Sequence, residues 1–236
     1  MRRAIIFCLP ILLIPMALPQ TPPDLTAVLK RVSEIYKAAS QYELIGDATC
    51  RARPLAAVVS VHLLIAFRAP NKYRMQAGTP CLGSGTGDMG EALMVHDGSA
   101  LWAYFLETNR YTSIPASALT ADAAGDLGDL RPDSTDRSMM WRYRGVADVA
   151  AKAAFVREDT VTFAGAKVTC YVVVVPPQER LPAQTWWIDK ISYHVIRMDD
   201  KDSSTVFTTV KLNEALPDEL FKFTPPAGAV KMELDR

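Results

Sequence analysis

The chain has 236 residues, with 26 Lys and Arg against 26 Asp and Glu, and 49% of its residues are hydrophobic. This length suits one domain or two small ones and is enough to bury a core. The charge balance argues against a strongly basic nucleic-acid binder and against an acidic disordered protein. The four cysteines are too few for a scaffold built on disulfides. We therefore expect a globular protein that does not bind nucleic acid.

The first 20 residues differ in composition from the rest. Met1 to Arg3 is basic, and the apolar run from Ala4 to Leu18 is too short to cross a bilayer as a helix. A polar, proline-rich stretch follows. This order is typical of a secretory signal peptide cleaved between Ala17 and Thr21, and a retained N-terminal membrane anchor is the alternative. We expect a periplasmic protein whose residues 21–236 form one domain.

The cysteines allow at most one disulfide within the exported chain. Cleavage of the signal peptide removes Cys8 and leaves three cysteines, so one thiol is unpaired or bonds to another molecule. Cys50 ends a predicted strand and Cys81 begins a loop, which makes them the better candidates for a bond. Cys170 lies within an apolar strand, where cysteine usually behaves as a small hydrophobic residue. Whether Cys50 and Cys81 are bonded or free stays open from these observations.

The predicted elements begin with one amphipathic helix. Thr21 to Asp24 is typical of a helix start, with a threonine cap, prolines in the first turn and an acid near the positive end. Apolar residues then recur at three- and four-residue spacing, namely Leu25, Val28, Leu29, Val32, Ile35, Tyr36 and Ala39. The helix therefore needs an apolar surface to cover.

About ten strands joined by short turns follow. Residues 59–67 alternate, and the odd-numbered Val59, Val61, Leu63, Ile65 and Phe67 are predicted to face the interior. Tyr73 and Met75 continue this apolar set after a turn. The other predicted strands are residues 92–96, 101–106, 110–114, 153–157, 160–163, 167–175, 185–188, 193–199 and 205–212. Strands connected in this way indicate an antiparallel sheet and not βαβ units.

A second helical segment is predicted within this run of strands. Residues 134–151 place apolar side chains on one side, namely Met139, Met140, Tyr143, Val146, Val149 and Ala150. A large antiparallel sheet with two helical segments indicates an α+β fold with the helices on one face of the sheet.

Motifs for catalysis, metal binding or cofactor binding are missing from the sequence. His62, His96 and His194 fall on predicted strands, far apart, without the spacing of a metal site, and we expect them to be partly exposed. Residues 85–90 match G-x-G-x-x-G, but a predicted strand follows where a dinucleotide site needs a helix. We therefore expect no enzyme, no cofactor and no metal.

An apolar sheet face is the remaining candidate for function. A small barrel fills such a face with its own side chains or with a ligand. The candidate lining residues are Val61, Leu63, Ile65, Phe67, Tyr73, Met75, Trp102 and Phe221. The two predicted helices, through Leu25, Val28, Leu29, Val32, Met139 and Met140, are candidates for a lid over it. A core filled by side chains, with no ligand, is the alternative interpretation.

Several short motifs resemble one known family. Residues 67–75 and 95–104 resemble the R-P-N-x-F and D-G-x-x-L-W-x-Y hairpins of LolA-type periplasmic lipoprotein carriers. The ending F-K-F-T-P-P-A-G at residues 221–228 resembles that family's F-x-F-x-P-P-x-G, and Trp187-Ile188-Asp189 is similar to its W-I-D hairpin. The resemblance covers residues 24–233, and the motifs occur in the family's order.

The resemblance implies an unclosed antiparallel half-barrel, monomeric, with helices as a lid over an apolar cavity. It implies binding of acyl chains of lipids or lipoproteins and their transport across the periplasm to the outer membrane, with inner- or outer-membrane proteins as partners. Family members of a second kind are envelope sensors that contact an anti-sigma factor or another membrane partner. The carriers close the lid with an arginine directly before the proline. Here that position is Ala69, and Arg68 lies one residue earlier, on the opposite strand face.

Overall fold

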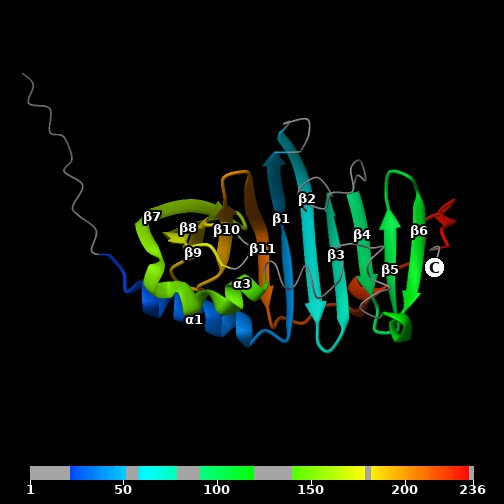
Figure 1. Ribbon diagram of the computed structural model, residues 1–236, viewed down its shortest axis with the longest axis horizontal. Helices are drawn as coiled ribbons and strands as arrows, with labels where there is room; N and C mark the ends of the chain where they lie inside the picture. The colour runs from blue at the N-terminus through cyan, green and yellow to red at the C-terminus, as the bar shows by residue number, and fades with distance from the viewer. Residues whose placement is uncertain (1–21, 52–57, 79–90, 120–139, 179–181, 234–236) are drawn as a thin grey trace, which may run out of the picture.

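The computed structural model describes residues 22–51, 58–78, 91–119, 140–178 and 182–233 (Figure 1). This part of the chain is an α+β fold with one unclosed sheet of twelve strands. The strands are β1 Gln41–Arg51, β2 Val58–Arg68, β3 Lys72–Gly78, β4 Glu91–His96, β5 Ala100–Phe105, β6 Arg110–Pro115, β7 Ala154–Phe163, β8 Ala166–Val175, β9 Gln184–Asp189, β10 Val195–Asp199, β11 Ser203–Leu212 and β12 Val230–Lys231. The helical elements are α1 Leu25–Lys37, α3 Met140–Gly145 and the 3-10 segments η2 Ala116–Ala118, η3 Val146–Lys152 and η4 Asp218–Phe221.

Apart from β12, which adds to β6, the sheet consists of two ladders of consecutive strands, β1 to β6 and β7 to β11, joined at one seam. The strand order is β12-β6-β5-β4-β3-β2-β1-β11-β10-β9-β8-β7, antiparallel throughout except for the parallel pair β12 and β6. The seam is the pairing of β1 with β11, where Lys211 Nζ donates to Glu43 Oε2 over 2.6 Å. Strands that are neighbours in sequence pair within each ladder, which is the arrangement that the short predicted turns indicated.

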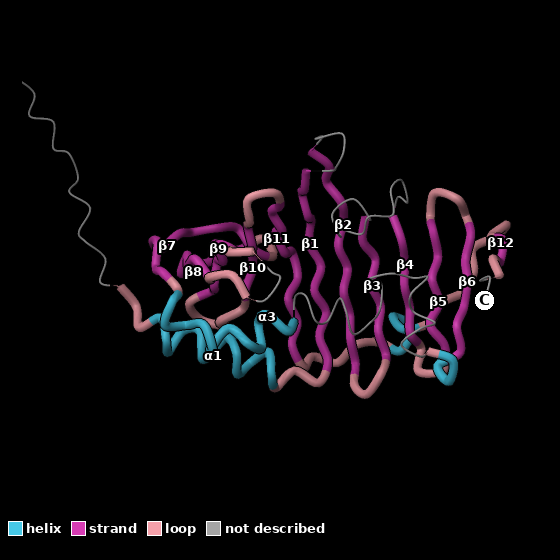
Figure 2. Tube along the Cα trace, viewed as in Figure 1, coloured by secondary structure: helices cyan, strands magenta, loops and turns pink. Residues whose placement is uncertain are grey.

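The sheet curls strongly at one end. In Figure 1, β1 to β6 stand side by side in a row, whereas β7 to β10 turn away from that row. β7 comes close to β11, although β8, β9 and β10 lie between them in the sheet order. Figure 2 shows α1 and α3 together at this curled end. The helices therefore cover one face of the curled half of the sheet.

The start of α1 differs from the prediction. Asp24, and not Thr21, is the residue that caps the helix, because its Oδ1 accepts a hydrogen bond of 3.2 Å from the Ala27 backbone N–H. Pro22 and Pro23 precede the helix and are not in its first turn. An aspartate at this position also matches the positive end of the helix dipole. Thr21 lies outside the described residues.

Two other predicted elements also differ in detail. The separate strands predicted at 153–157 and 160–163 form the single strand β7, whose register shifts between Phe155 and Arg157. In the predicted helix 134–151, the described part is α-helical from Met140 to Gly145 and continues as the 3-10 segment η3. Tyr143, Val146 and Ala150 of this segment are buried, as predicted.

The large apolar core lies on one face of the sheet, which we call the inner face. It includes Leu63 and Ile65 of β2 and Tyr73 and Met75 of β3, together with side chains of α1, α3 and η3. The alternation predicted for residues 59–67 is confirmed where it is strongest, because Leu63 and Ile65 are buried while His62 and Ser60 are exposed. The opposite face, the outer face, carries smaller apolar clusters.

The β4–β5 turn predicts a measurable acid sensitivity. Asp97 Oδ1 accepts hydrogen bonds from the backbone N–H groups of Ser99 and Ala100 at 2.7 and 2.9 Å, and Oδ2 accepts one from Trp102 Nε1 at 3.1 Å. Partial burial raises the pKa of Asp97, but these bonds and one from the Ser99 hydroxyl outweigh it and hold the pKa well below the usual range. A depressed carboxylate pKa stabilises the fold above the unfolded-state value of about 3.9, and the contribution is lost as the pH falls below it.

We therefore expect the free energy of unfolding to fall between pH 5 and pH 3, as measured by urea denaturation at each pH. Asp97→Asn, which cannot ionise, is expected to be less stable at pH 7 and to lose less stability over the same pH range. Equal pH dependence in the two proteins would contradict the role given to this carboxylate.

Candidate functional site

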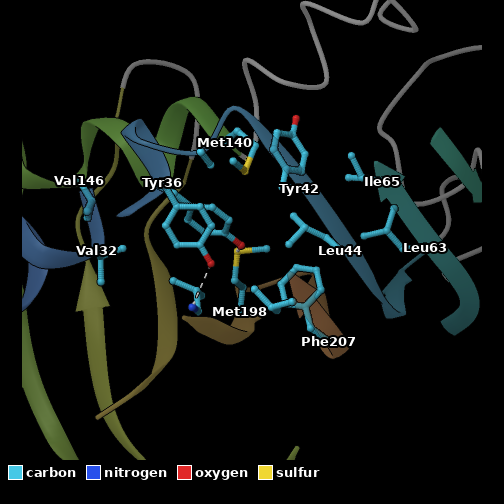
Figure 3. Close-up of a cluster of buried hydrophobic side chains, with 14 of the residues drawn as sticks. Val32, Tyr36, Tyr42, Leu44, Leu63, Ile65, Met140, Val146, Met198 and Phe207 are labelled. Atoms are coloured by element: carbon cyan, nitrogen blue, oxygen red, sulfur yellow. Dashed lines mark hydrogen bonds between the residues drawn. The ribbon is translucent and has the colours of Figure 1, made fainter. Parts of the chain in front are cut away.

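The candidate site is the inner face of the curled half of the sheet, together with the helices that cover it. From α1, the stripe Val28, Leu29, Val32 and Tyr36 is buried against this face. The curled half of the sheet adds side chains of β8 to β11 to the same cluster, namely Val173, Val175, Trp186, Ile188, Val195, Met198, Phe207 and Val210. Figure 3 shows Tyr36 and Val32 turned toward Met198 and Phe207 across this interface. The surface that the helices cover is therefore almost entirely apolar.

Aromatic rings form the centre of the interface between helices and sheet. The ring centroids of Tyr36 and Tyr143 are 4.5 Å apart, and Tyr143 meets Trp186 edge-on at 5.2 Å. The Tyr36 hydroxyl accepts a hydrogen bond of 3.2 Å from the Val195 backbone N–H (Figure 3). The Tyr143 hydroxyl donates to Met198 Sδ over 2.8 Å. Burial raises the pKa of both tyrosines, so both stay neutral.

Arg142 of α3 is a buried cation that connects the helices to the sheet side of the interface. Its side chain is 2% exposed, and its Nη2 donates to the carbonyl oxygens of Pro176 and Pro182 at 3.2 and 2.7 Å. The guanidinium lies over the Trp186 ring, 5.9 Å from its centroid. Burial lowers the pKa of Arg142, and its Nε and Nη1 atoms have no hydrogen-bond partner in the described part of the chain. Arg142 thus binds a carbonyl oxygen just after β8 and another just before β9.

The two helical segments are also bonded to each other. Arg144 Nε donates to the Tyr36 carbonyl oxygen over 3.1 Å, and the Ser33 hydroxyl donates to the Arg144 carbonyl oxygen. Among the described residues, the hydrogen bonds between this layer and the sheet side involve the side chains of Tyr36, Tyr143, Arg142 and Asn213, whose Nδ2 donates to the Ala38 carbonyl oxygen over 3.2 Å. The layer of α1, α3 and η3, called here the helix layer, is therefore attached by side chains.

Most of the predicted lining residues share the inner face. Leu63, Ile65, Tyr73 and Met75 are buried in the main core, while Val61 and Phe67 on the same side of β2 are half-buried. The predicted lid residues Val28, Leu29, Val32 and Met140 are buried in this cluster, and the partly buried Leu25 packs against it. Met139 lies outside the described residues.

Trp102 and Phe221 lie on the outer face, so the prediction that they line the inner face is wrong. In β5 the buried inner-face residues are Leu101 and Ala103, and alternation turns Trp102 the other way. Phe221 follows β11 in a segment that crosses the outer face, where it is buried with Ala66 and Leu216. The Phe223 ring lies 5.6 Å from that of Trp102. The F-x-F ending therefore covers the outer side of the sheet.

Arg68 binds this C-terminal segment and not the helix layer. It forms an ion pair with Asp218, donates to the Leu216 carbonyl oxygen over 3.3 Å, and lies 4.9 Å from the centroid of the Phe221 ring. The prediction that Arg68 faces away from the helices is confirmed by these contacts. Ala69, at the position where the carriers have their arginine, is exposed. In this chain the arginine that joins helices to sheet is Arg142, on the helix side.

The cysteines agree with the prediction as far as they are described. Cys50 is disulfide-bonded, and Cys81, its predicted partner, lies outside the described residues, so the pairing stays a prediction. Cys170 is a free, buried thiol, and burial together with the charges of Asp189 and Asp159 raises its pKa to about 12. It packs on the outer face with Val172, Trp187 and Ile196, as a small hydrophobic residue.

The histidines are spread over the sheet. His62 is exposed beside Asp47, His194 is half-buried, and His96 is buried, which corrects the expectation that all three are partly exposed. Among the described residues, no group of three or more His, Cys, Asp or Glu side chains could hold a metal ion.

The G-x-G-x-x-G match at 85–90 lies outside the described residues, and β4 begins at Glu91 directly after it. In the described part, no helix has the length and apolar character needed to span a bilayer.

Sequence reasoning missed three residues of the interface: Trp186, Met198 and Arg142. Trp186 and Trp187 are adjacent in β9, so alternation requires them to face opposite sides, but the sequence does not say which one faces the helices. Met198 lies within a predicted strand, and its position there does not distinguish it as a contact of the helices. For a buried arginine in an apolar helical stretch, the sequence offers no signal.

Comparison with known proteins gives a distant relative in sequence and several solved structures of low similarity. No family model matches the chain. An uncharacterized protein of Methanocaldococcus jannaschii is 24% identical over 212 residues, which are 87% of this chain and 52% of that protein. The chain thus spans about half the length of the curated relative it matches.

The solved structures that match this chain include two mycobacterial proteins and a LolA superfamily protein. LprF of Mycobacterium bovis gives a TM-score of 0.47 at 12% identity and covers 88% of this chain and 98% of its own. Lipoprotein LppX of Mycobacterium tuberculosis gives 0.45 at 14% identity, over 84% and 99%. LolA superfamily protein NE2245 of Nitrosomonas europaea gives 0.32 at 13% identity, over 84% and 96%. At these scores and identities, the likenesses carry no information about the function of this chain.

Proposed function

We propose that the chain is an exported, non-enzymatic protein that binds acyl chains of lipids or lipoproteins between the helix layer and the inner face of the sheet. One observation carries the proposal: a continuous apolar face is covered by helices that are attached through a few side chains. Tyr36, Tyr143 and Arg142 make these attachments. A layer held in this way can move as a unit and expose the apolar face to a ligand, which a strand paired in the sheet cannot do.

The energetics favour a long alkyl chain as the ligand. Burial of each CH₂ group contributes about 0.8 kcal/mol, so a chain of about a dozen methylenes gains roughly 10 kcal/mol before costs. A micromolar dissociation constant requires about 8 kcal/mol. The difference of about 2 kcal/mol is smaller than the cost of ordering the ligand and displacing the helix layer, so micromolar binding requires a longer chain or more than one chain. Short chains therefore fall below useful affinity, and long chains exceed it.

The proposed biological role is transport across the periplasm toward the outer membrane by a monomeric carrier. The basic and apolar N-terminal segment supports export, and the apolar inner face supports a hydrophobic cargo. A donor or acceptor protein at the inner or outer membrane would be the partner. The interpretation as an envelope sensor predicts instead a co-purifying protein and no bound lipid.

The test uses two neighbouring residues of α1 that face different sides. Leu25 is half-buried and packs against the main core, whereas Thr26 is exposed. We expect Leu25→Glu to lower the affinity for a fluorescent long-chain fatty acid at least tenfold, because a carboxylate at the apolar interface opposes burial of an alkyl chain. Thr26→Glu adds the same charge to the same turn of the helix and is expected to bind like the wild type.

Binding is measured by fluorescence titration, and lipid that co-purifies is identified by native mass spectrometry. Circular dichroism of both variants checks that each is folded. Absence of co-purified lipid together with absence of fatty-acid uptake by the wild type would overturn the proposal, as would equal losses in the two variants.

A further inference from the structure

A pocket lined by both charged and apolar residues lies at the edge of the helix layer, beside the apolar interface described above. It has a volume of about 530 Å³ and is lined by Lys37, Arg144, Gly145, Asp148, Val149, Pro177 and Gln178. Three separate parts of the chain meet here: the end of α1, the junction of α3 with η3, and the segment that follows β8. Its volume is within the range of small-molecule sites in proteins. We call it the helix-edge pocket.

Positive charge exceeds negative charge in this pocket. Lys37 and Arg144 are the cations and Asp148 is the only carboxylate among the lining residues. The Arg144 guanidinium is held in place by its Nε bond to the Tyr36 carbonyl oxygen. Lys37 and Asp148 are both exposed at the mouth. A cation that is already oriented binds an anionic group without losing further side-chain freedom.

Gln178 adds an unsatisfied hydrogen-bond acceptor. Its side chain is 7% exposed, and its Oε1 has no hydrogen-bond partner in the described part of the chain. An amide oxygen buried without a donor costs about 1–3 kcal/mol, and native structures rarely leave one in that state. This oxygen has almost no accessible surface, so a ligand hydroxyl or ammonium group in the pocket would supply a donor once the Gln178 side chain turns toward it.

The pocket adjoins the apolar interface. Val149 lines the pocket and also packs against the main core. Lys37 directly follows the buried Tyr36, and Pro177 is two residues beyond the buried Val175. A molecule with its polar end in the pocket would therefore have its apolar part directed along the interface between the helix layer and the sheet.

We propose that the helix-edge pocket binds the phosphate-bearing headgroup of an amphipathic lipid whose acyl chains lie under the helix layer. Lys37 and Arg144 would bind the phosphate, and Gln178 and Asp148 would accept hydrogen bonds from a headgroup ammonium or hydroxyl. The inference rests on the proposed function for the acyl chains and adds to it a preference for phospholipid over neutral lipid.

The test compares three probes by isothermal titration calorimetry of the full chain, below the micelle concentration. They are dioctanoyl phosphatidylethanolamine, whose two chains together carry about a dozen methylenes, dioctanoylglycerol with the same chains but no phosphate, and inorganic phosphate. We expect the phospholipid to bind at least about tenfold more tightly than the diglyceride, as one or two charge-assisted hydrogen bonds provide. Lys37→Glu is expected to remove most of this preference without changing diglyceride affinity.

Lys30→Glu is the matched control, because Lys30 is exposed on the same helix and does not line the pocket. It is expected to bind like the wild type. Equal affinity of the wild type for phospholipid and diglyceride would overturn the headgroup site while leaving acyl binding intact. Binding of inorganic phosphate that depends on Lys37, without binding of either lipid, would overturn the lipid assignment and the proposed function together. An equal effect of the two lysine variants would overturn the role of the pocket.

Discussion

Replacing Gly46 by alanine is expected to lower the free energy of unfolding by about 3 kcal/mol or more. Gly46 is a buried residue of β1 at the seam with β11, where the register shifts between Ile45 and Gly46. A Cβ atom at this position would lie 2.3 Å from the Val206 carbonyl oxygen and 2.8 Å from the Phe207 Cα. Both are backbone atoms of a paired strand, so they cannot rotate away. The methyl group must push β1 and β11 apart.

Gly145→Ala is the matched control for this prediction. Nothing lies within 4 Å of a Cβ built at Gly145, the last residue of α3. Its backbone is in the ordinary helical region at a φ of −90°. This variant is expected to be as stable as the wild type or more stable by up to about 1 kcal/mol, because alanine has fewer unfolded conformations than glycine. Urea denaturation followed by circular dichroism measures both, and a Gly46→Ala protein within 1 kcal/mol of the wild type would contradict the close approach at the seam.

Trp186→Ala is expected to lower the free energy of unfolding by about 3–5 kcal/mol, the range for truncating a buried large aromatic residue. Trp186 has no exposed surface and contacts both Tyr143 and Arg142 of the helix layer. Its Nε1 donates to Gln184 Oε1 over 3.0 Å. The truncation leaves a cavity directly beneath α3, so the helix layer should also become looser. Hydrogen exchange of the α3 amides would report this loosening separately from global stability.

Ile191→Ala is the surface control for the truncation. Ile191 is 89% exposed in the turn between β9 and β10, so its removal should change the stability by no more than about 0.5 kcal/mol. A second variant, Trp186→Phe, keeps an aromatic ring against Tyr143 and is expected to lose less than the alanine variant. A Trp186→Ala protein as stable as Ile191→Ala would show that the helices do not depend on this contact.

Sequence reasoning succeeded where the apolar pattern has one clear period. In β2 the alternation around Leu63 and Ile65 identifies the buried face, and the α1 stripe around Leu29 and Val32 has the spacing of a helix. Short turns between strands were enough to predict an antiparallel α+β fold. These features depend on residues close together in sequence, so local spacing determines them.

The same reasoning was insufficient where both faces of a strand are apolar or where distant segments meet. β5 reads Ala-Leu-Trp-Ala-Tyr-Phe, so alternation has no contrast from which to assign Trp102 to a face. Phe221 lies beyond the last long strand, and its face is decided by where the chain crosses the sheet. The helix-edge pocket combines Lys37, Arg144 and Gln178, which are separated by many residues, so no local pattern predicts it.

The seam between β1 and β11 also sets the order in which the chain can assemble. Each ladder of hairpins closes loops of a few residues, whereas the pair Glu43 and Lys211 closes a loop that spans most of the chain. Such a contact has a high entropic cost and forms late in folding. The sheet cannot be completed until the strand near the C-terminus has been synthesised. A nascent chain with this topology stays incompletely folded until β11 has been synthesised and can pair with β1.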